Sequence, residues 1–248
     1  MATGSEALEG VTQASSLVKT ERRRRLDHRF YLGMAIAMAF GVVAGFTRTY
    51  YARSYFHSPA IPFWVHVHGA VFTGWMLFYI LQCLLAMYGG MKLHRSLGIV
   101  GGLLASGVVI MGSAVAIRQA REGRFFPFPD SYSSLTISFG QMALFAVFIY
   151  LSLKMRRDSE AHKRYILMAT QLFFFPSFGR LLHGIGPVTL VLALCFYVAG
   201  PIYDRVTRGS IHRAYRLGVP LLILTMPPFG VLASHAPPLR HALDFIIR

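Results

Sequence analysis

The chain has 248 residues, of which 54% are hydrophobic and only 14% are charged. About a quarter of the residues in a soluble domain are charged, and the apolar residues here come in blocks long enough to cross a bilayer, so the composition excludes an ordinary soluble domain and predicts an all-α polytopic membrane protein. The net charge of +15 comes from short basic clusters between the apolar blocks, which favours anionic lipid headgroups as partners and argues against nucleic acid.

The predicted elements begin with a disordered cytoplasmic tail, residues 1–28, which has no signal-peptide core and contains a basic anchor at residues 21–25. A transmembrane domain of seven helices follows over residues 29–235, and residues 236–248 form a short outer tail. The predicted spans are residues 30–47, 63–88, 97–117, 132–153, 165–182, 185–203 and 217–234. Pro176 lies in the fifth span, and Pro227 and Pro228 break the seventh.

The basic residues predict the orientation of these spans. With the N-terminus in the cytoplasm, 17 of the 25 Lys and Arg residues fall in inner segments. The positive-inside rule therefore predicts a bacterial inner-membrane protein with its N-terminus inside and its C-terminus outside.

Two regular spacings predict how the second and third spans face their neighbours. His68, Trp75 and Gln82 recur every seven residues and should share an inward face. On the third span, Gly98, Gly102 and Ser106 recur every four residues, which predicts a stripe that a neighbouring helix can approach closely.

The acidic residues exclude some functions. All ten Asp and Glu residues lie outside the middles of the predicted spans, which argues against a pump driven by a buried carboxylate. The last span has no lysine for a retinal Schiff base, and Cys83 and Cys195 both fall inside spans, where no disulfide is indicated.

Histidines at both membrane faces are the candidate site residues. The outer set is His68 and His183 with Arg180 beside them, and the inner set comprises His94, His162 and His212. Paired imidazoles from different helices are what a haem b requires, and nearby cations would neutralise its propionates.

Two other interpretations of these histidines stay open. Copper or another transition metal could bind His66, His68 and His183, although His66 and His68 lie ~200° apart on one helix and could share an ion only if the helix starts between them. Alternatively, the histidines anchor the helix ends in the interface. No span has two histidines ~13–14 residues apart, the spacing that brackets two haems on one helix.

Several short motifs resemble a family of uncharacterised bacterial multi-span inner-membrane proteins, a domain of unknown function. They are His66-Val67-His68-Gly69 with Thr73 and Trp75, Leu93-His94-Arg95 with Leu97-Gly98, Ala161-His162-Lys163-Arg164, and Tyr203-Asp204 with His212. The resemblance covers about residues 30–235 and implies the multi-span fold, but no reaction. It also implies a polar set of His66, His68, His94, His162, Arg164, Arg180, Asp204 and His212. The family pattern has Pro after the last histidine, where this chain has Arg213.

These observations lead to three functional hypotheses. The first is a redox protein that binds a histidine-ligated cofactor and exchanges electrons with quinone. The second is a non-catalytic subunit or assembly factor of a larger membrane complex, with the Gly98–Ser106 stripe as a packing surface. The third is a small-molecule transporter in which Arg180 holds an anion and the prolines break helices around the site.

Overall fold

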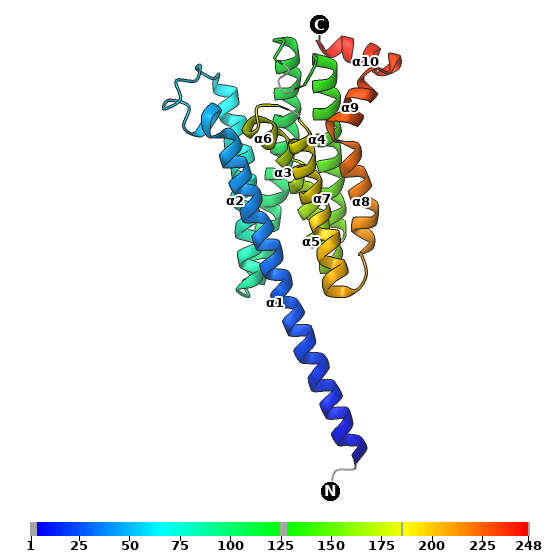
Figure 1. Ribbon diagram of the computed structural model, residues 1–248. Coiled ribbons are helices and arrows are strands. Elements are labelled where there is room, and N and C mark those ends of the chain that lie inside the picture. The colour runs from blue at the N-terminus through cyan, green and yellow to red at the C-terminus, as the bar shows by residue number, and fades with distance from the viewer. Residues whose placement is uncertain (1–3, 125–127, 185, 248) are drawn as a thin grey trace.

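The computed structural model describes residues 4–124, 128–184 and 186–247, with side chains from residue 12 onward. These residues form helices joined by short turns and loops, without a strand in the described ranges (Figure 1). Five of the helices are long and apolar enough to cross a membrane, or up to six if one bent pair counts as a single span. The prediction of an all-α protein with several helices long and apolar enough to cross a membrane is therefore confirmed for the described residues.

The helices follow one another with short connections. Their bounds are α1 Gly4–Phe46, the π-helical turn η1 Thr47–Tyr51, α2 Phe63–Met87, α3 Met91–Arg121, α4 Ser131–Lys154, α5 Ser159–Gln171, α6 Phe174–Leu181, α7 Pro187–Arg208, α8 Arg213–Leu224, α9 Pro227–Ser234 and α10 Pro237–Ile247.

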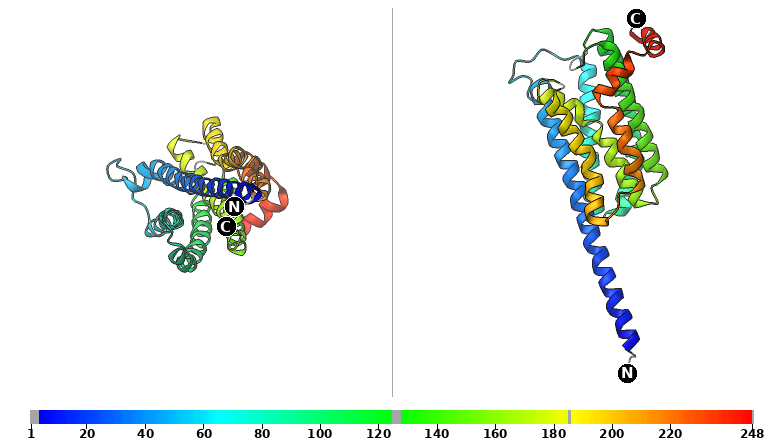
Figure 2. Two further views of the ribbon diagram at one scale, coloured as in Figure 1. Left: turned by 90° about the horizontal axis from the view of Figure 1, so that it is seen from below. Right: turned by 45° about the vertical axis from the view of Figure 1, so that its right-hand side comes forward.

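The long helices run antiparallel to their sequence neighbours and define two ends of the bundle (Figures 1 and 2). The turns α2–α3, α4–α5 and α7–α8 lie at one end, which we call the basic end because these turns and the helix ends beside them carry Lys and Arg. The connection from α1 to α2, together with α6 and α10, lies at the other, the C-terminal end. The first half of α1 extends beyond the basic end.

Two predicted spans are broken in the structure. The predicted seventh span is α8 and α9, bent by 57° ahead of Pro227, as the proline pair indicated. The predicted fifth span, residues 165–182, is divided into α5 and α6. Pro176 accounts for this division, because its nitrogen has no hydrogen to donate to the carbonyl of Leu172. Neither α5 nor α6 alone is long enough to cross a membrane. The described helices that are long enough number five, or six with the bent pair, so they do not reach the predicted seven spans.

The N-terminal segment differs from the expectation of a disordered tail, and the expected short outer tail is helical. Residues expected to form a disordered segment belong to the continuous helix α1, which starts at Gly4. The segment is rich in Ala, Glu, Arg and Leu and contains no Pro, which favours a helix. The expected outer tail is the helix α10, which packs on α3 and α4 and buries Leu243.

Close helix contacts occur at other glycines than the predicted stripe. A Cβ atom at Gly45 would collide with the backbone of Ser177, so α1 and α6 touch there. No atom of the described residues lies within 4 Å of a Cβ built on Gly98 or Gly102, and Ser106 is exposed. The prediction of close packing along this stripe was therefore wrong for the isolated chain: Gly98 and Gly102 instead form part of a cavity wall.

Candidate functional site

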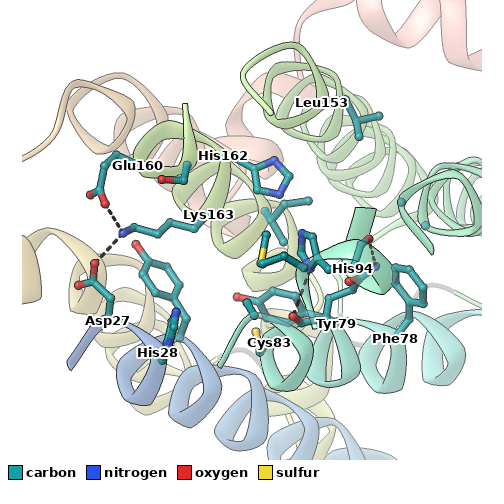
Figure 3. Close-up of a pocket in the computed structure, with 18 of the residues that line it drawn as sticks. Asp27, His28, Phe78, Tyr79, Cys83, His94, Leu153, Glu160, His162 and Lys163 are labelled. Atoms are coloured by element: carbon teal, nitrogen blue, oxygen red, sulfur yellow. Dashed lines mark hydrogen bonds and ion pairs between the residues drawn. The ribbon is translucent and has the colours of Figure 1, made fainter. Parts of the chain in front are cut away.

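A cavity of about 690 Å³ opens near the basic end, between α1, α2, α3, α4 and α5 (Figure 3). Its volume lies within the roughly 300–1,000 Å³ of cofactor and ligand sites. Most of its wall is apolar. Gly98, Gly101 and Gly102 form one side of the cavity, where these residues have no side chain to project into it. The cations Arg23, Arg24 and Lys163 also line it.

Two of the predicted inner histidines meet in this cavity. His94 comes from the first turn of α3 and His162 from the first turn of α5 (Figure 3). Their ring centroids lie 6.3 Å apart, with the ring planes at 78°. Helices distant in sequence thus bring these two imidazoles together, as the cofactor hypothesis requires.

Backbone carbonyls hold the Nδ1 atom of each ring. His162 Nδ1 lies 2.9 Å from the carbonyl oxygen of Ser152, and His94 Nδ1 lies 3.4 Å from that of Gln82. The Ser152 hydroxyl also lies 2.8 Å from His162 Nδ1 and donates to the carbonyl of His162 at 3.2 Å. When Nδ1 donates to the backbone carbonyl, which can only accept, Nε2 keeps its lone pair. Burial lowers the pKa of His162 from its ordinary value, which favours the neutral ring.

The spacing of the two rings suits coordination of one metal ion from opposite sides. Imidazole nitrogens bind metal ions at about 2.0–2.1 Å, which places the centroids of two opposed rings about 6 Å apart. A carbonyl that fixes the second nitrogen is the usual support of a metal-bound histidine. The two imidazoles and the apolar wall, with its glycine-lined side, therefore fit a planar metal cofactor such as haem.

His212, the third inner candidate, has a different position. It is the N-cap of α8, where its Nδ1 accepts a hydrogen bond from the backbone of Ala214 at 3.1 Å. Its own backbone nitrogen donates to Asp204 Oδ2 at 3.2 Å. Burial and the charge of Arg164 lower the pKa of His212. The structure thus gives His212 a capping role, and it does not line the cavity with His94 and His162.

A network of six charged side chains adjoins the cavity. At its centre Arg164 and Asp204, both with fully buried side chains, form a bidentate pair with distances of 2.9 and 2.5 Å. Arg164 also donates to Glu160 Oε2 at 2.8 Å. The remaining members are Asp27, Lys163 and Arg208.

The network joins three helices. Asp27 of α1 accepts from Lys163 of α5 at 2.6 Å and from Arg208 of α7 at 2.5 Å. Three carboxylates thus balance three cations. Burial alone would raise the pKa of Glu160, but the hydrogen bonds and charges of Lys163 and Arg164 outweigh it and lower this pKa to about 2. Lys163 and Glu160 also line the cavity, so the network forms part of its wall (Figure 3).

Sequence reasoning missed most of this network. The predicted spans leave Lys163 and Arg164 between the fourth and fifth spans, and the sequence does not identify their acidic partners. Arg164, Asp204 and His212, which the family resemblance grouped in one polar set, do lie together. One available signal was that three of only ten acidic residues, Asp27, Glu160 and Asp204, lie in or beside the most basic segments.

The predicted outer set lies at the C-terminal end but does not form one ligand cluster. His183 Nε2 lies 3.1 Å from Arg48, and Arg180 stacks on Phe46 at 4.6 Å. His68 packs on Phe72, with its Nδ1 buried and unbonded.

The remaining outer ligand candidate, His66, contacts a different ring, that of Tyr50 at 5.7 Å. Throughout the described ranges, no group of three or more His, Cys, Asp or Glu side chains is placed to hold a metal ion. The geometry thus gives no support to the set of His66, His68 and His183 as metal ligands.

Comparisons with known proteins found no match. The chain matches no protein-family model, no curated protein and no solved structure. The geometry of the site therefore carries the functional argument.

Proposed function

We propose that this chain is a bacterial inner-membrane protein that binds one haem b between His94 and His162 and transfers electrons. The single observation that carries the proposal is the pair of imidazoles at 6.3 Å in the cavity wall, each with Nδ1 directed at a backbone carbonyl. Haem supplies one-electron chemistry when it is bound.

The chain's own residues would bind, orient and shield the cofactor. His94 and His162 would hold the group through their imidazole nitrogens, and the carbonyls of Gln82 and Ser152 would fix the orientation of the two rings. The apolar wall excludes water, which contributes to the reduction potential. Arg23 and Arg24, which also line the cavity, are the candidate partners of the propionates.

The basic end would face the cytoplasm. The turns at this end, the helix ends beside them and the extending part of α1 together carry 17 of the 25 Lys and Arg residues, which supports an orientation with the N-terminus inside and the C-terminus outside. In this arrangement α5 with α6 would complete a crossing between the longer helices, which gives seven spans. The cavity would lie near the inner leaflet, where a quinone is the natural electron partner.

The test is an optical spectrum of the detergent-purified protein, reduced minus oxidised, after expression with ample haem and metals. We expect haem b bands at one haem per chain, with loss of the bands in His94→Ala and His162→Ala. The matched control is His28→Ala, because His28 lines the same cavity but is not one of the facing pair. Metal analysis of the same samples detects copper, iron or zinc bound without haem.

A colourless, metal-free protein would refute the cofactor proposal, as would bands that survive both histidine substitutions. Bands lost equally in His28→Ala would mean that the cavity, rather than the histidine pair, determines binding. A clear spectrum with one equivalent of metal that depends on His94 and His162 would replace haem by a bare metal ion at the same pair.

The second candidate is a non-catalytic subunit or assembly factor. The observation in its favour is the outer face of α3, where Ile99 and Leu103 are 75% and 71% exposed. Such a face suits a partner helix as well as lipid. Co-purification of a partner that is lost in Leu103→Ala, together with a colourless isolated chain, would favour this candidate.

A further inference from the structure

We propose that Arg180 and Arg48 form a binding site for a phosphate group at the C-terminal end of the bundle. The proposal does not depend on the haem proposal, because the two sites lie at opposite ends of the molecule (Figure 1). The chemical class of the ligand is a phosphate monoanion or diester, as found in an anionic lipid headgroup or a soluble phosphate.

Several contacts bring together the two segments that carry Arg180 and Arg48. Arg180 stacks on Phe46, which lies two residues before Arg48. Arg48 Nη1 lies 3.1 Å from His183 Nε2, and the backbone nitrogen of His183 donates to the carbonyl of Arg180 at 3.4 Å. The close approach of α1 and α6 at Gly45 fixes this arrangement.

Neither arginine has a carboxylate partner among the described residues. The hydrogen bond of Arg180 goes to the backbone carbonyl of Pro176 at 3.2 Å, and the other neighbour of Arg48 is the ring of Phe56. The basic end is different, because there each buried cation pairs with at least one acid. Arg48 is exposed, whereas Arg180 is half-buried, and a half-buried guanidinium without a counter-charge is costly at membrane depth.

A phosphate group matches what these side chains offer. Guanidinium groups bind phosphate oxygens through two parallel hydrogen bonds, and two of them can share one phosphate. Arg48 donates to His183 Nε2 if this nitrogen is unprotonated, which leaves its other donors free. Tyr50 and Tyr51 follow Arg48 in the turn η1, and aromatic rings of this kind are favoured at the depth of lipid headgroups.

The experiment measures thermal stability of the full chain in a maltoside detergent, which contains no phosphate. Three conditions are compared: the detergent alone, the detergent with phosphatidylglycerol, and the detergent with inorganic phosphate. The variants are Arg180→Gln and Arg48→Gln. The matched control is Arg124→Gln, which removes the same charge from an exposed side chain at the same end of the bundle.

We expect one of the two phosphate sources to raise the melting temperature of the wild type. The concentration required should increase at least about tenfold in Arg180→Gln, the size expected for loss of a hydrogen bond to a charged group, and remain unchanged in Arg124→Gln. Stabilisation by phosphatidylglycerol identifies a lipid headgroup, and stabilisation by inorganic phosphate identifies a soluble ligand.

Two results would overturn the proposal: no stabilisation by either source, or an equal loss in Arg180→Gln and Arg124→Gln. If Arg180→Gln does not fold, Arg180→Lys and Arg48→Gln keep the test decisive. Lysine retains the charge but not the paired donors, so it should still weaken the dependence on phosphate. Unchanged phosphate dependence in both would also overturn the proposal.

Discussion

Substitution of Asp204 by Asn is the sharpest test of the buried charge network. Asp204 and Arg164 both have side chains with 0% exposure, and the pair makes two hydrogen bonds. Asn removes the negative charge but keeps the size of the side chain and one oxygen acceptor. The guanidinium of Arg164 then stays buried with a weaker partner.

The size of the effect follows from what Arg164 retains. Removal of one partner from a buried ion pair costs about 3–5 kcal/mol. Arg164 keeps its contact with Glu160 at 2.8 Å, whose side chain is 42% exposed, and the new amide can accept one bond. We therefore expect about 3 kcal/mol, at the lower end of this range. For a chain of this length this corresponds to a decrease in melting temperature of about 6–12 °C.

The assay is unfolding of the purified protein in mild detergent, by heat and by titration with a denaturing detergent. Glu122→Gln is the control, because it breaks an exposed pair with Arg118 that should contribute about 0–1 kcal/mol. The double variant Arg164→Met with Asp204→Leu should be more stable than Asp204→Asn, because it removes both charges of the pair, and Arg208, which also contacts Asp204 at 3.1 Å, keeps Asp27 as a partner. Equal effects of Asp204→Asn and Glu122→Gln would refute the reasoning.

Three further predictions address packing, pH and the capping histidine. Gly45→Ala should destabilise the protein by about 1–3 kcal/mol because its Cβ would meet the backbone of Ser177, whereas Gly33→Ala on the same helix has open space and should not, in the same thermal assay. The lowered pKa of Glu160 means that its stabilisation is complete above about pH 4.5 and is lost as the pH falls toward 2, so the melting temperature of the wild type should decrease over this interval more than that of Glu160→Gln. His212→Ala should cost about 1 kcal/mol through loss of the α8 cap but leave any haem spectrum unchanged, and a lost spectrum would contradict its capping role.

Hydropathy predicted the long helices because each of them carries its own signal. α2, α3, α4 and α7 lie close to predicted spans, and the break at Pro227 followed from the prolines alone. The division between α5 and α6 depends on how Pro176 is accommodated among neighbouring helices, which hydropathy does not encode. The helical form of residues 4–28 follows from their local helix propensity. The prediction of a disordered tail gave more weight to the polar composition of this segment than to that propensity.

The candidate site was predictable only in part, because side-chain pairing depends on tertiary packing. His94 and His162 were in the inner set, but nothing in their spacing distinguished them from His212. The glycine stripe suggested a helix contact, since sequence spacing alone cannot tell a surface that packs against a helix from one that borders a cavity. The pairing of Arg164 with Asp204 joins residues 40 positions apart, which is beyond any local pattern.

The position of the charge network links the stability of the bundle to the shape of the cavity. Lys163 and Glu160 line the cavity and also tie α5 to the rest of the network, and Lys163 follows the candidate ligand His162 directly in sequence. A rigid ionic anchor beside a ligand fixes the direction of its ring, which a cofactor site requires. Asp27 extends this anchor to α1, so loss of its charge should loosen the helix that closes one side of the cavity. If the haem proposal holds, Asp27→Asn should therefore weaken haem retention without removing either ligand. Full retention of haem in this variant would show that the charge network does not support the cofactor site.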